Sequence, residues 1–246
     1  MFKFWRFTPI AFVLVLAVGS FAISYAQESR QEASKVQLPA DTQALIHLNF
    51  RAMIDSPLEK KMVIEKEIIK ALDFDIEFIA EIGFDPLKDI DSITIAAPGG
   101  GDMEKGLIIV AGKFKADKLV AKANEEAKNN KDKVKIHKAG DKTIFEVIIP
   151  EQQVPMFMMI ASNSTILAST QKEYLEKALA NSGSKLANKD FSALVEKLDP
   201  DLAISMVAVS SAFPSKSLPE PAKAIMDGIE SIGGGIGIDK DVTLKI

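Results

Sequence analysis

The chain has 246 residues, of which 47% are hydrophobic and 26% are charged, and its formal net charge is −4. This composition is typical of a globular protein and excludes a disordered, collagen-like or multi-span membrane chain. The sequence contains no cysteine. Disulfides, thiolate nucleophiles and cysteine-type zinc sites are therefore excluded, and packing must stabilise the fold.

Residues 1–26 have the pattern of an export signal. Lys3 and Arg6 precede an apolar stretch from Phe7 to Ile23, and the small residues Ser24 and Ala26 occupy the two positions that a signal peptidase reads. This pattern predicts a signal peptide that is cut after Ala26. The alternative is an uncleaved anchor, because the apolar stretch approaches the roughly 20 residues that span a bilayer.

Removal of the signal changes the charge and the aromatic content. Without Lys3 and Arg6, 28 of the 30 basic residues remain against 34 acidic residues, a net charge of −6. The only Trp is lost as well, and Tyr174 remains as the one Tyr. Few aromatic platforms and negative charge argue against sugar clefts and nucleic-acid grooves. We expect no nucleic-acid partner and no stable membrane span once the signal is removed. An exported chain without disulfides favours the bacterial periplasm or secretion from a bacterium.

Residues 27–39 predict a flexible polar leader, and residues 40–198 predict an α+β domain. Its sheet is expected to be largely antiparallel, with helices packed on one face, because strands in hairpin runs alternate with helices. The expected strands are 44–50, 92–97, 107–110, 134–137, 143–149, 156–161 and 165–169, and the expected helices are 116–129, 172–180 and 191–198.

A longer amphipathic helix is expected from Leu58 to Ile82. Asp55 or Ser56 would cap it, Pro57 would occupy its first turn, and Gly83 would end it. Apolar residues recur through this segment at helical spacing.

Residues 199–246 predict a partial second copy of the first strand-helix-strand unit. A strand through Ile204 and Met206 precedes a helix at 220–232, a glycine-rich helix stop at 233–237 and a last strand from Val242 to Ile246. That last strand would lack a hairpin partner. Either the chain is a truncated form of a longer duplicated protein, or the last strand borrows an edge from the first copy.

We predict no catalytic, cofactor-binding or metal-binding residues. The two histidines, His47 and His137, lie on the polar faces of expected strands, and nothing in the sequence brings them together for a catalytic triad or a two-histidine metal site. Ser182 and Lys185 match the SxxK motif of serine acylases, but in a loop instead of at a helix start. The glycines at 233–237 follow a helix, unlike those of a phosphate-binding loop.

Two further clusters have a chemical and a structural interpretation. Asp85, Asp89 and Asp91 could hold a calcium ion, but the EF-hand spacing is missing and turn formation explains them. Met156, Met158 and Met159 could bind cuprous copper, but alternation along a strand places Met159 opposite the other two, which favours core packing.

Four segments carry a resemblance to exported bacterial proteins of unknown function: DTQALIHLNF, DSPLEK, GFDPLKDIDSITIA and GLIIVAGKF. Those proteins have a strand-helix-strand-strand unit with a GxDPxxDI-type turn. The resemblance covers Asp41 to Phe114, with a weaker match after Asp199, and it implies fold and export without catalytic residues.

From these observations we expect an exported, non-enzymatic binding or structural module of the bacterial envelope. The alternative is a carrier for a small apolar ligand or lipid, held between the sheet and the helix from Leu58 to Ile82. A carrier would have an apolar cavity of roughly 300 Å³ or more.

Overall fold

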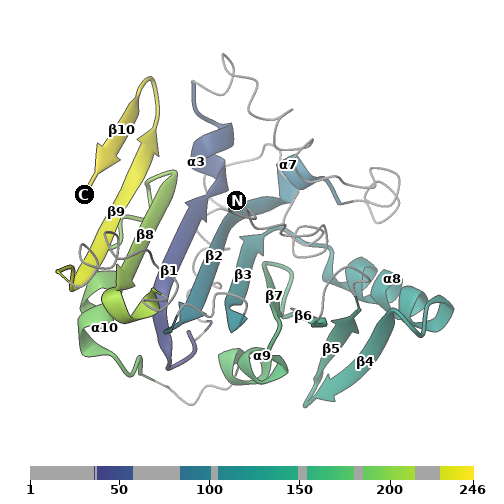
Figure 1. Cartoon of the computed structure of the whole chain (residues 1–246). Helices are drawn as coiled ribbons and strands as arrows, with labels where there is room; N and C mark the ends of the chain where they lie inside the picture. The colour runs from purple at the N-terminus through teal and green to yellow at the C-terminus, as the bar shows by residue number, and fades with distance from the viewer. Residues whose placement is uncertain are drawn as a thin grey trace, which may run out of the picture.

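In the part of the chain that the structure describes, ten antiparallel strands form one sheet, which is the centre of the fold (Figure 1). The computed structural model describes residues 36, 38–57, 84–100, 105–148, 154–179, 185–213 and 228–246. The strands are β1 (Thr42–Asn49), β2 (Ile90–Pro98), β3 (Leu107–Gly112), β4 (Val134–Ala139), β5 (Lys142–Val147), β6 (Met156–Ile160), β7 (Thr165–Ser169), β8 (Ile204–Val209), β9 (Ser231–Ile238) and β10 (Val242–Lys245). Their order across the sheet is β10-β9-β8-β1-β2-β3-β7-β6-β5-β4. The predicted α+β class with a largely antiparallel sheet is confirmed.

Five helices and one 3₁₀ turn are described. They are α3 (Phe50–Ile54), α7 (Pro86–Asp89), α8 (Ala116–Asn129), α9 (Lys172–Leu179), α10 (Lys189–Val195) and the 3₁₀ turn η2 (Ser210–Ala212). α8 has the predicted bounds, and α9 and α10 lie within a few residues of theirs. The predicted signal, most of the leader, the predicted helix at 58–82 and residues 220–227 of the predicted helix at 220–232 lie outside the described residues. The described end of that last helix is not helical, because β9 begins at Ser231.

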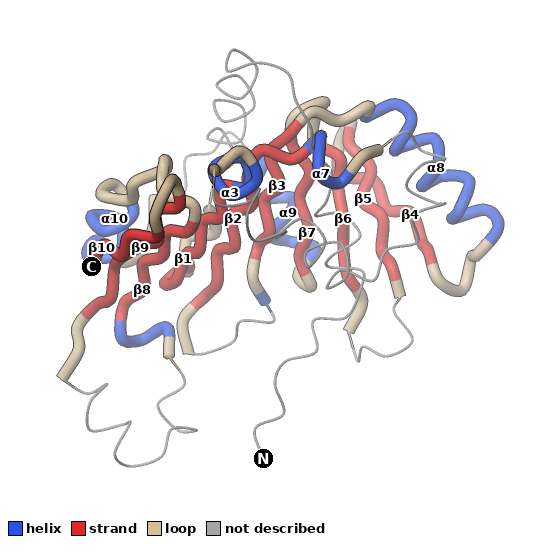
Figure 2. The backbone as a smooth tube through the Cα atoms, turned by 90° about the horizontal axis from the view of Figure 1, so that it is seen from above, coloured by secondary structure: helices blue, strands red, loops and turns tan. Residues whose placement is uncertain are grey.

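Alternation along the strands gives the sheet two apolar faces, which we call the front face and the back face. On β3, Ile108 and Val110 belong to the front face, whereas Leu107 and Ile109 belong to the back face. Such a run of four apolar residues is typical of a strand that is covered on both sides. The sheet is therefore the middle layer of the molecule in its central part (Figure 2).

The helices divide between these two faces, so the expected packing of all helices on one face is not confirmed. Met53 of α3 and Leu119 of α8 pack against the front cluster, which is built around Ile93 and Val110. α9 and α10 pack on the back face. They contribute Leu175, Ala178 and the fully buried Phe191 to the clusters there.

The chain turns from β1 directly into α3, earlier than the predicted helix start at Asp55. Asn49 caps this short helix, because its Oδ1 accepts a hydrogen bond of 3.1 Å from the backbone N–H of Ala52. Asparagine is among the preferred N-cap residues. Phe50, which we expected on the strand, is instead the first residue of α3 and is buried in the front cluster.

The glycine-rich segment is a strand, and this corrects two predictions. Residues 233–237 lie inside β9 instead of ending a helix. β9 pairs with β8 on one side and with β10 on the other. The last strand consequently has the hairpin partner that we expected it to lack. Because glycine is depleted in strands, the run of glycines predicts a break in regular structure. In the structure the glycines instead allow other chain segments to approach β9 closely.

β1 lies in the sheet between strands from the first part and strands from the last part of the described chain. It pairs with β2 along one edge and with β8 along the other. Outward from this β1–β8 pair, the strand order is β2-β3 on one side and β9-β10 on the other. β8, β9 and β10 therefore extend the same sheet to which β1 to β7 contribute.

Candidate functional site

The front face is apolar and accessible at the end of the sheet formed by β8, β9 and β10. Directly opposite residues in an antiparallel pair share a face, so the register places Met206 beside Ile46, and Leu244 beside Ile236. We call this surface the apolar shelf. Its members are Ile46, Ile204, Met206, Ile232, Ile236, Ile238, Val242 and Leu244.

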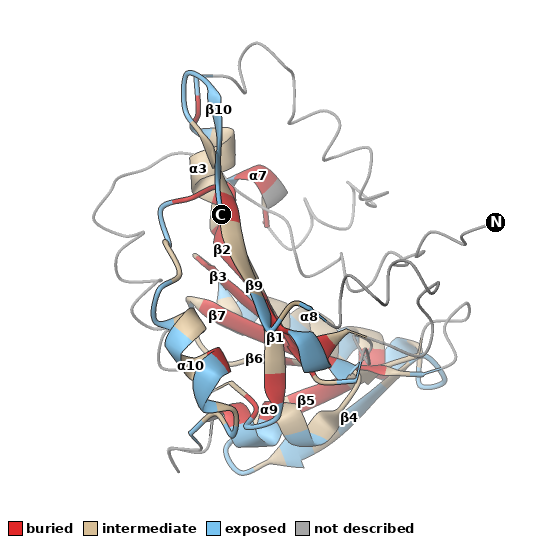
Figure 3. Cartoon of the chain, turned by 60° about the vertical axis from the view of Figure 1, so that its left-hand side comes forward, coloured by how far each residue is buried: buried red, intermediate tan, exposed pale blue. Residues whose placement is uncertain are grey.

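The exposure of the shelf rises toward the sheet edge. Met206 on β8 is 38% exposed, whereas Val242 and Leu244 on β10 are 63% and 69% exposed. The isoleucines between them are half-buried. Figure 3 shows the same gradient, with β10 exposed beyond the buried central strands. An apolar patch that continues across several strands is a common feature of binding surfaces.

On the back face, β9 and β10 carry small and polar residues. Gly233, Gly235 and Gly237 of β9 lie on it, together with Thr243 and Lys245 of β10. A Cβ at Gly235 would lie 2.4 Å from the carbonyl oxygen of Ile204 and 2.7 Å from Leu202 Cδ1. Gly235 and Gly237 therefore make room for Leu202, which lies in the loop that connects α10 to β8.

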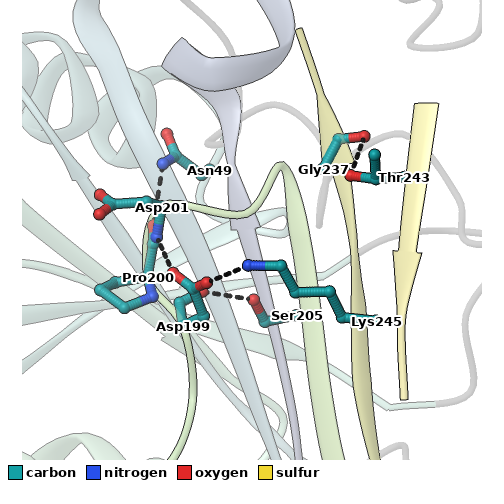
Figure 4. A network of polar contacts seen from close by, with 8 residues as sticks. All are labelled: Asn49, Asp199, Pro200, Asp201, Ser205, Gly237, Thr243 and Lys245. Carbon is teal, nitrogen blue, oxygen red and sulfur yellow. Dashed lines mark hydrogen bonds and ion pairs between the residues drawn. The ribbon is translucent and has the colours of Figure 1, made fainter. Parts of the chain in front are cut away.

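That loop is held against the back face by a network of polar contacts (Figure 4). Lys245 Nζ donates to Asp199 Oδ2 at 2.9 Å. Ser205 Oγ donates to the Asp199 carbonyl oxygen at 2.7 Å, and the backbone N–H of Asp201 donates to Asp199 Oδ1 at 3.1 Å. Residues of β8 and β10 are thus joined through Asp199.

The hydrogen bonds to Asp199 stabilise its charged form. The bond from Lys245 makes the largest contribution and the backbone N–H of Asp201 the next, and together they lower the pKa of the Asp199 carboxyl below its usual value. The pair is solvent-exposed, so its main effect is to position the strand and the loop.

Asn49 anchors the same loop from β1. Its Nδ2 donates to the carbonyl oxygen of Pro200 at 2.9 Å, while its Oδ1 caps α3. Its backbone N–H donates to the carbonyl oxygen of Ala203. The side chain is only 2% exposed, so both ends of the amide are used inside the fold. The back face thus fixes β1, β8 and β10 to one loop, and the shelf on the front face is presented by a braced set of strands.

The two histidines lie far apart in the sheet. His47 on β1 pairs its Nδ1 with Thr94 Oγ1 at 2.9 Å. His137 lies on β4, at the far end of the sheet, where its Nε2 is 2.6 Å from Glu146 Oε2. Lys135 donates to the other oxygen of Glu146 at 2.8 Å. The hydrogen bond from Lys135 and, to a smaller extent, the one with His137 lower the pKa of the Glu146 carboxyl. The two histidines were not expected to share a site, and the sheet order separates them.

The aspartates after Gly83 are used in the local turn. Asp85 caps α7, since its Oδ1 accepts from the backbone N–H of Leu87 at 3.1 Å, and Asp89 Oδ2 accepts from the N–H of Asp85. Burial raises the pKa of Asp89. Within the described part of the chain, no group of three or more metal-binding side chains is placed to hold an ion.

The remaining motifs are divided or lie in the core. Met156 and Met158 pack on the front face and Met159 on the back face, as the alternation predicted. Ser182 lies outside the described residues, so the SxxK motif has no geometry here, and Lys185 is described alone.

A surface hollow of about 610 Å³ lies on the back face beside α9. Its floor contains the fully buried side chains of Met159 and Leu175. Asp141, Lys142 and Glu176 give its lining a charged component. The hollow is an open surface feature beside α9 and the β4–β5 turn, and it is not the apolar cavity expected under the helix from Leu58 to Ile82. That segment lies outside the described residues.

The shelf was not foreseen from the sequence, although a signal for it exists. Ile236 and Ile238 alternate with glycine, and Val242 and Leu244 alternate with polar residues across a short turn. Two alternating segments separated by three residues are typical of a hairpin with one apolar face. The glycine run concealed this pattern. In the described residues no helix combines the length and the apolarity that a membrane crossing requires.

Comparison with protein-family models finds no match for this chain, and comparison with curated proteins finds none either. The chain can be aligned with crystal structures of TP0453. Form I aligns with a TM-score of 0.47 and 8% sequence identity, over 85% of this chain and 76% of TP0453. Form IV aligns with a TM-score of 0.44 and 10% identity, over 85% of this chain and 79% of TP0453.

Proposed function

We propose that this chain is a non-enzymatic binding module that holds an apolar partner, a protein surface, on the apolar shelf. The observation that carries this proposal is the exposure of Val242 and Leu244 on a face that continues through Met206 into the core. A partner that covers such side chains removes apolar area from water, and this stabilises the complex by about 25 cal/mol per Å² of buried apolar surface. The braced back face keeps the shelf preformed, which lowers the entropic cost of binding.

We also propose that the module is exported to the bacterial periplasm or secreted. The basic start and apolar stretch of residues 1–26 support this, as does the absence of cysteine in the sequence. An internal duplication is part of the same proposal. It is supported by the strand order, because β2 and β3 follow β1 on one side of the β1–β8 pair as β9 and β10 follow β8 on the other side. In this alignment β9 corresponds to β2, and β10 to β3.

The alternative function is a carrier for a small apolar ligand or lipid, and the hollow beside α9 supports it. Its lining includes the apolar residues Ala139, Met159 and Leu175, which suit a hydrocarbon group. The charges of Lys142 and Glu176 suit a polar head at the opening. This site is on the back face, so it can be tested separately from the shelf.

One set of variants distinguishes the shelf from the hollow. The probe is 1-anilinonaphthalene-8-sulfonate, whose fluorescence increases on apolar protein surfaces. The double variant Met206→Lys with Leu244→Lys should lower the probe signal at least several-fold. Thr243→Lys, on the back face of the same strand, is the matched control and should leave the signal unchanged. Ala139→Trp fills the hollow, and a loss of signal in that variant alone would favour the carrier.

Photocrosslinking in the native cells then tests for a protein partner. A benzoyl-phenylalanine at position 244 should yield a recurring crosslinked protein that differs from a second copy of this chain, and the same group at position 243 should not yield that protein. Equal probe signals in all the variants, together with equal crosslinking at positions 243 and 244, would contradict the proposed function.

A further inference from the structure

The two edges of the sheet are built differently. At one edge, β4 carries the exposed Lys135 and Lys138, and α8 packs beside it. Charged side chains and covering helices are ways in which proteins prevent edge strands from pairing with other chains. At the other edge, β10 exposes Val242 and Leu244 and is the outermost described strand. The second edge has the properties of a pairing surface.

We propose that two copies of this chain associate through antiparallel pairing of their β10 strands, centred on Thr243. In a two-fold symmetric pair, each residue lies opposite one of equal parity, because opposite residues must share a face. Centring on Thr243 places Val242 opposite Leu244 of the second copy, and this pair occurs twice. Both pairs lie on the front face and bring exposed apolar side chains together.

The charges of the back face fit the same register. Asp241 comes opposite Lys245 of the second copy, and by symmetry Lys245 comes opposite Asp241 of the second copy. Opposite charges in directly opposed positions stabilise antiparallel pairs. Lys245 already contacts Asp199 at 2.9 Å, so in the dimer it would lie between two carboxylates. Thr243 would face Thr243 of the second copy, and threonine pairs are favourable on a sheet.

The association joins the two shelves into one apolar face. It is independent of what the shelf binds, since it uses the backbone edge of β10 and the residues beside it. β10 has four residues, so the ladder is short and the interface belongs to the small, weak class. The dimer should therefore depend on concentration, and a covalent trap is the appropriate test.

The absence of cysteine allows a clean trap at the symmetry axis. Cα atoms of disulfide-bonded residues lie about 4.4 to 6.8 Å apart, and directly opposite residues in a sheet meet this requirement. Thr243→Cys should therefore give a disulfide-linked dimer under mild oxidation. Leu244→Cys should link to itself poorly, since the two copies of residue 244 would be diagonal neighbours about 7 to 8 Å apart. Lys138→Cys at the β4 edge is the matched control for random collision.

A mixture of the single variants Val242→Cys and Leu244→Cys tests the register itself, because it should give the mixed disulfide faster than either variant links to itself.

Sedimentation of the cysteine-free chain gives a second readout. Thr243→Lys places two like charges opposite each other and should shift the protein to the monomer while the apolar probe still binds. The proposal would be overturned if Thr243→Cys formed disulfide-linked dimers no faster than Lys138→Cys. It would also be overturned if Leu244→Cys formed such dimers faster than Thr243→Cys. A failed dimer with intact probe binding leaves the proposed function standing.

Discussion

Lys245 Nζ lies 2.9 Å from Asp199 Oδ2, and this ion pair links the outermost strand of the sheet to the loop that follows α10. Both side chains are partly exposed. The pair therefore acts together with the hydrogen bonds from Ser205 and Asn49 to the same loop. Their combined effect is to brace the back face of the strands whose front face is the apolar shelf.

Replacement of Lys245 by Met should raise the pKa of Asp199. The hydrogen bond from Lys245 is the main cause of the lowered pKa, and the N–H of Asp201 would still hold it somewhat below the usual value. Titration of Asp199 by NMR checks this. Lys240→Met, in the exposed β9–β10 turn, is the control and should leave Asp199 unchanged.

The same pair makes stability depend on pH in a defined direction. Because the pKa of Asp199 is lower in the folded chain, its contribution is present above the pKa of an unfolded aspartate. The contribution is lost as the pH falls through the lowered folded pKa. The wild-type chain should therefore lose its advantage over Lys245→Met in acid. Parallel unfolding curves for the two proteins at all pH values would contradict this.

Gly235→Ala should destabilise the fold by about 1 to 3 kcal/mol, the usual cost of overpacking. The new Cβ would lie 2.4 Å from a backbone oxygen of Ile204, which cannot move without disturbing β8. Gly233→Ala is the matched control on the same face of the same strand. Its Cβ would be 3.4 Å from Val207 Cγ1, near ordinary contact, and the lost backbone freedom of the unfolded chain offsets the cost. Urea unfolding at equilibrium measures both variants, and equal losses would contradict the packing argument.

Asn49→Asp should cost about 2 kcal/mol or more, although it keeps the oxygen that caps α3. It removes the Nδ2 donor to Pro200 and buries a carboxylate beside that carbonyl oxygen. Asn188→Asp is the control. Asn188 caps α10 through Phe191 N–H at 3.0 Å, and a carboxylate at a half-buried helix start should be neutral or slightly stabilising. Thermal unfolding at neutral pH should separate the two variants. Similar midpoints would show that the contact with Pro200 contributes little.

Local patterns predicted most of the described elements. The pieces from β4 to β7 alternate in short runs between turns, and α8 has the composition of a surface helix, so each could be placed without tertiary information. α3 was missed because the strand pattern runs through Phe50, although Asn49 is a strong N-cap residue. β9 was missed because glycine is uncommon in strands, and its place here depends on Leu202, which the sequence does not show to be near.

The faces of the sheet could not be assigned from the sequence for a similar reason. The run from Leu107 to Val110 is apolar at every position, so it gives no preferred side for the helices. The shelf combines residues from β1 with residues from β8 to β10, and only the register of those strands brings Ile46 beside Met206. The expectation that the chain has no catalytic residues rested on the composition and motifs of its sequence, and it remains a prediction.

The pairing of β1 with β8 also has a consequence for the order of folding. Ala44 lies opposite Ala208, so the strand nearest the start of the described chain is completed only after most of the polypeptide has been synthesised. Contacts of such large sequence separation carry a high loop-closure entropy and form slowly. Until β8 arrives, one side of β1 offers open backbone groups. A nascent chain that has not yet reached Ile204 should therefore be a client for chaperones, which would protect that strand from premature aggregation.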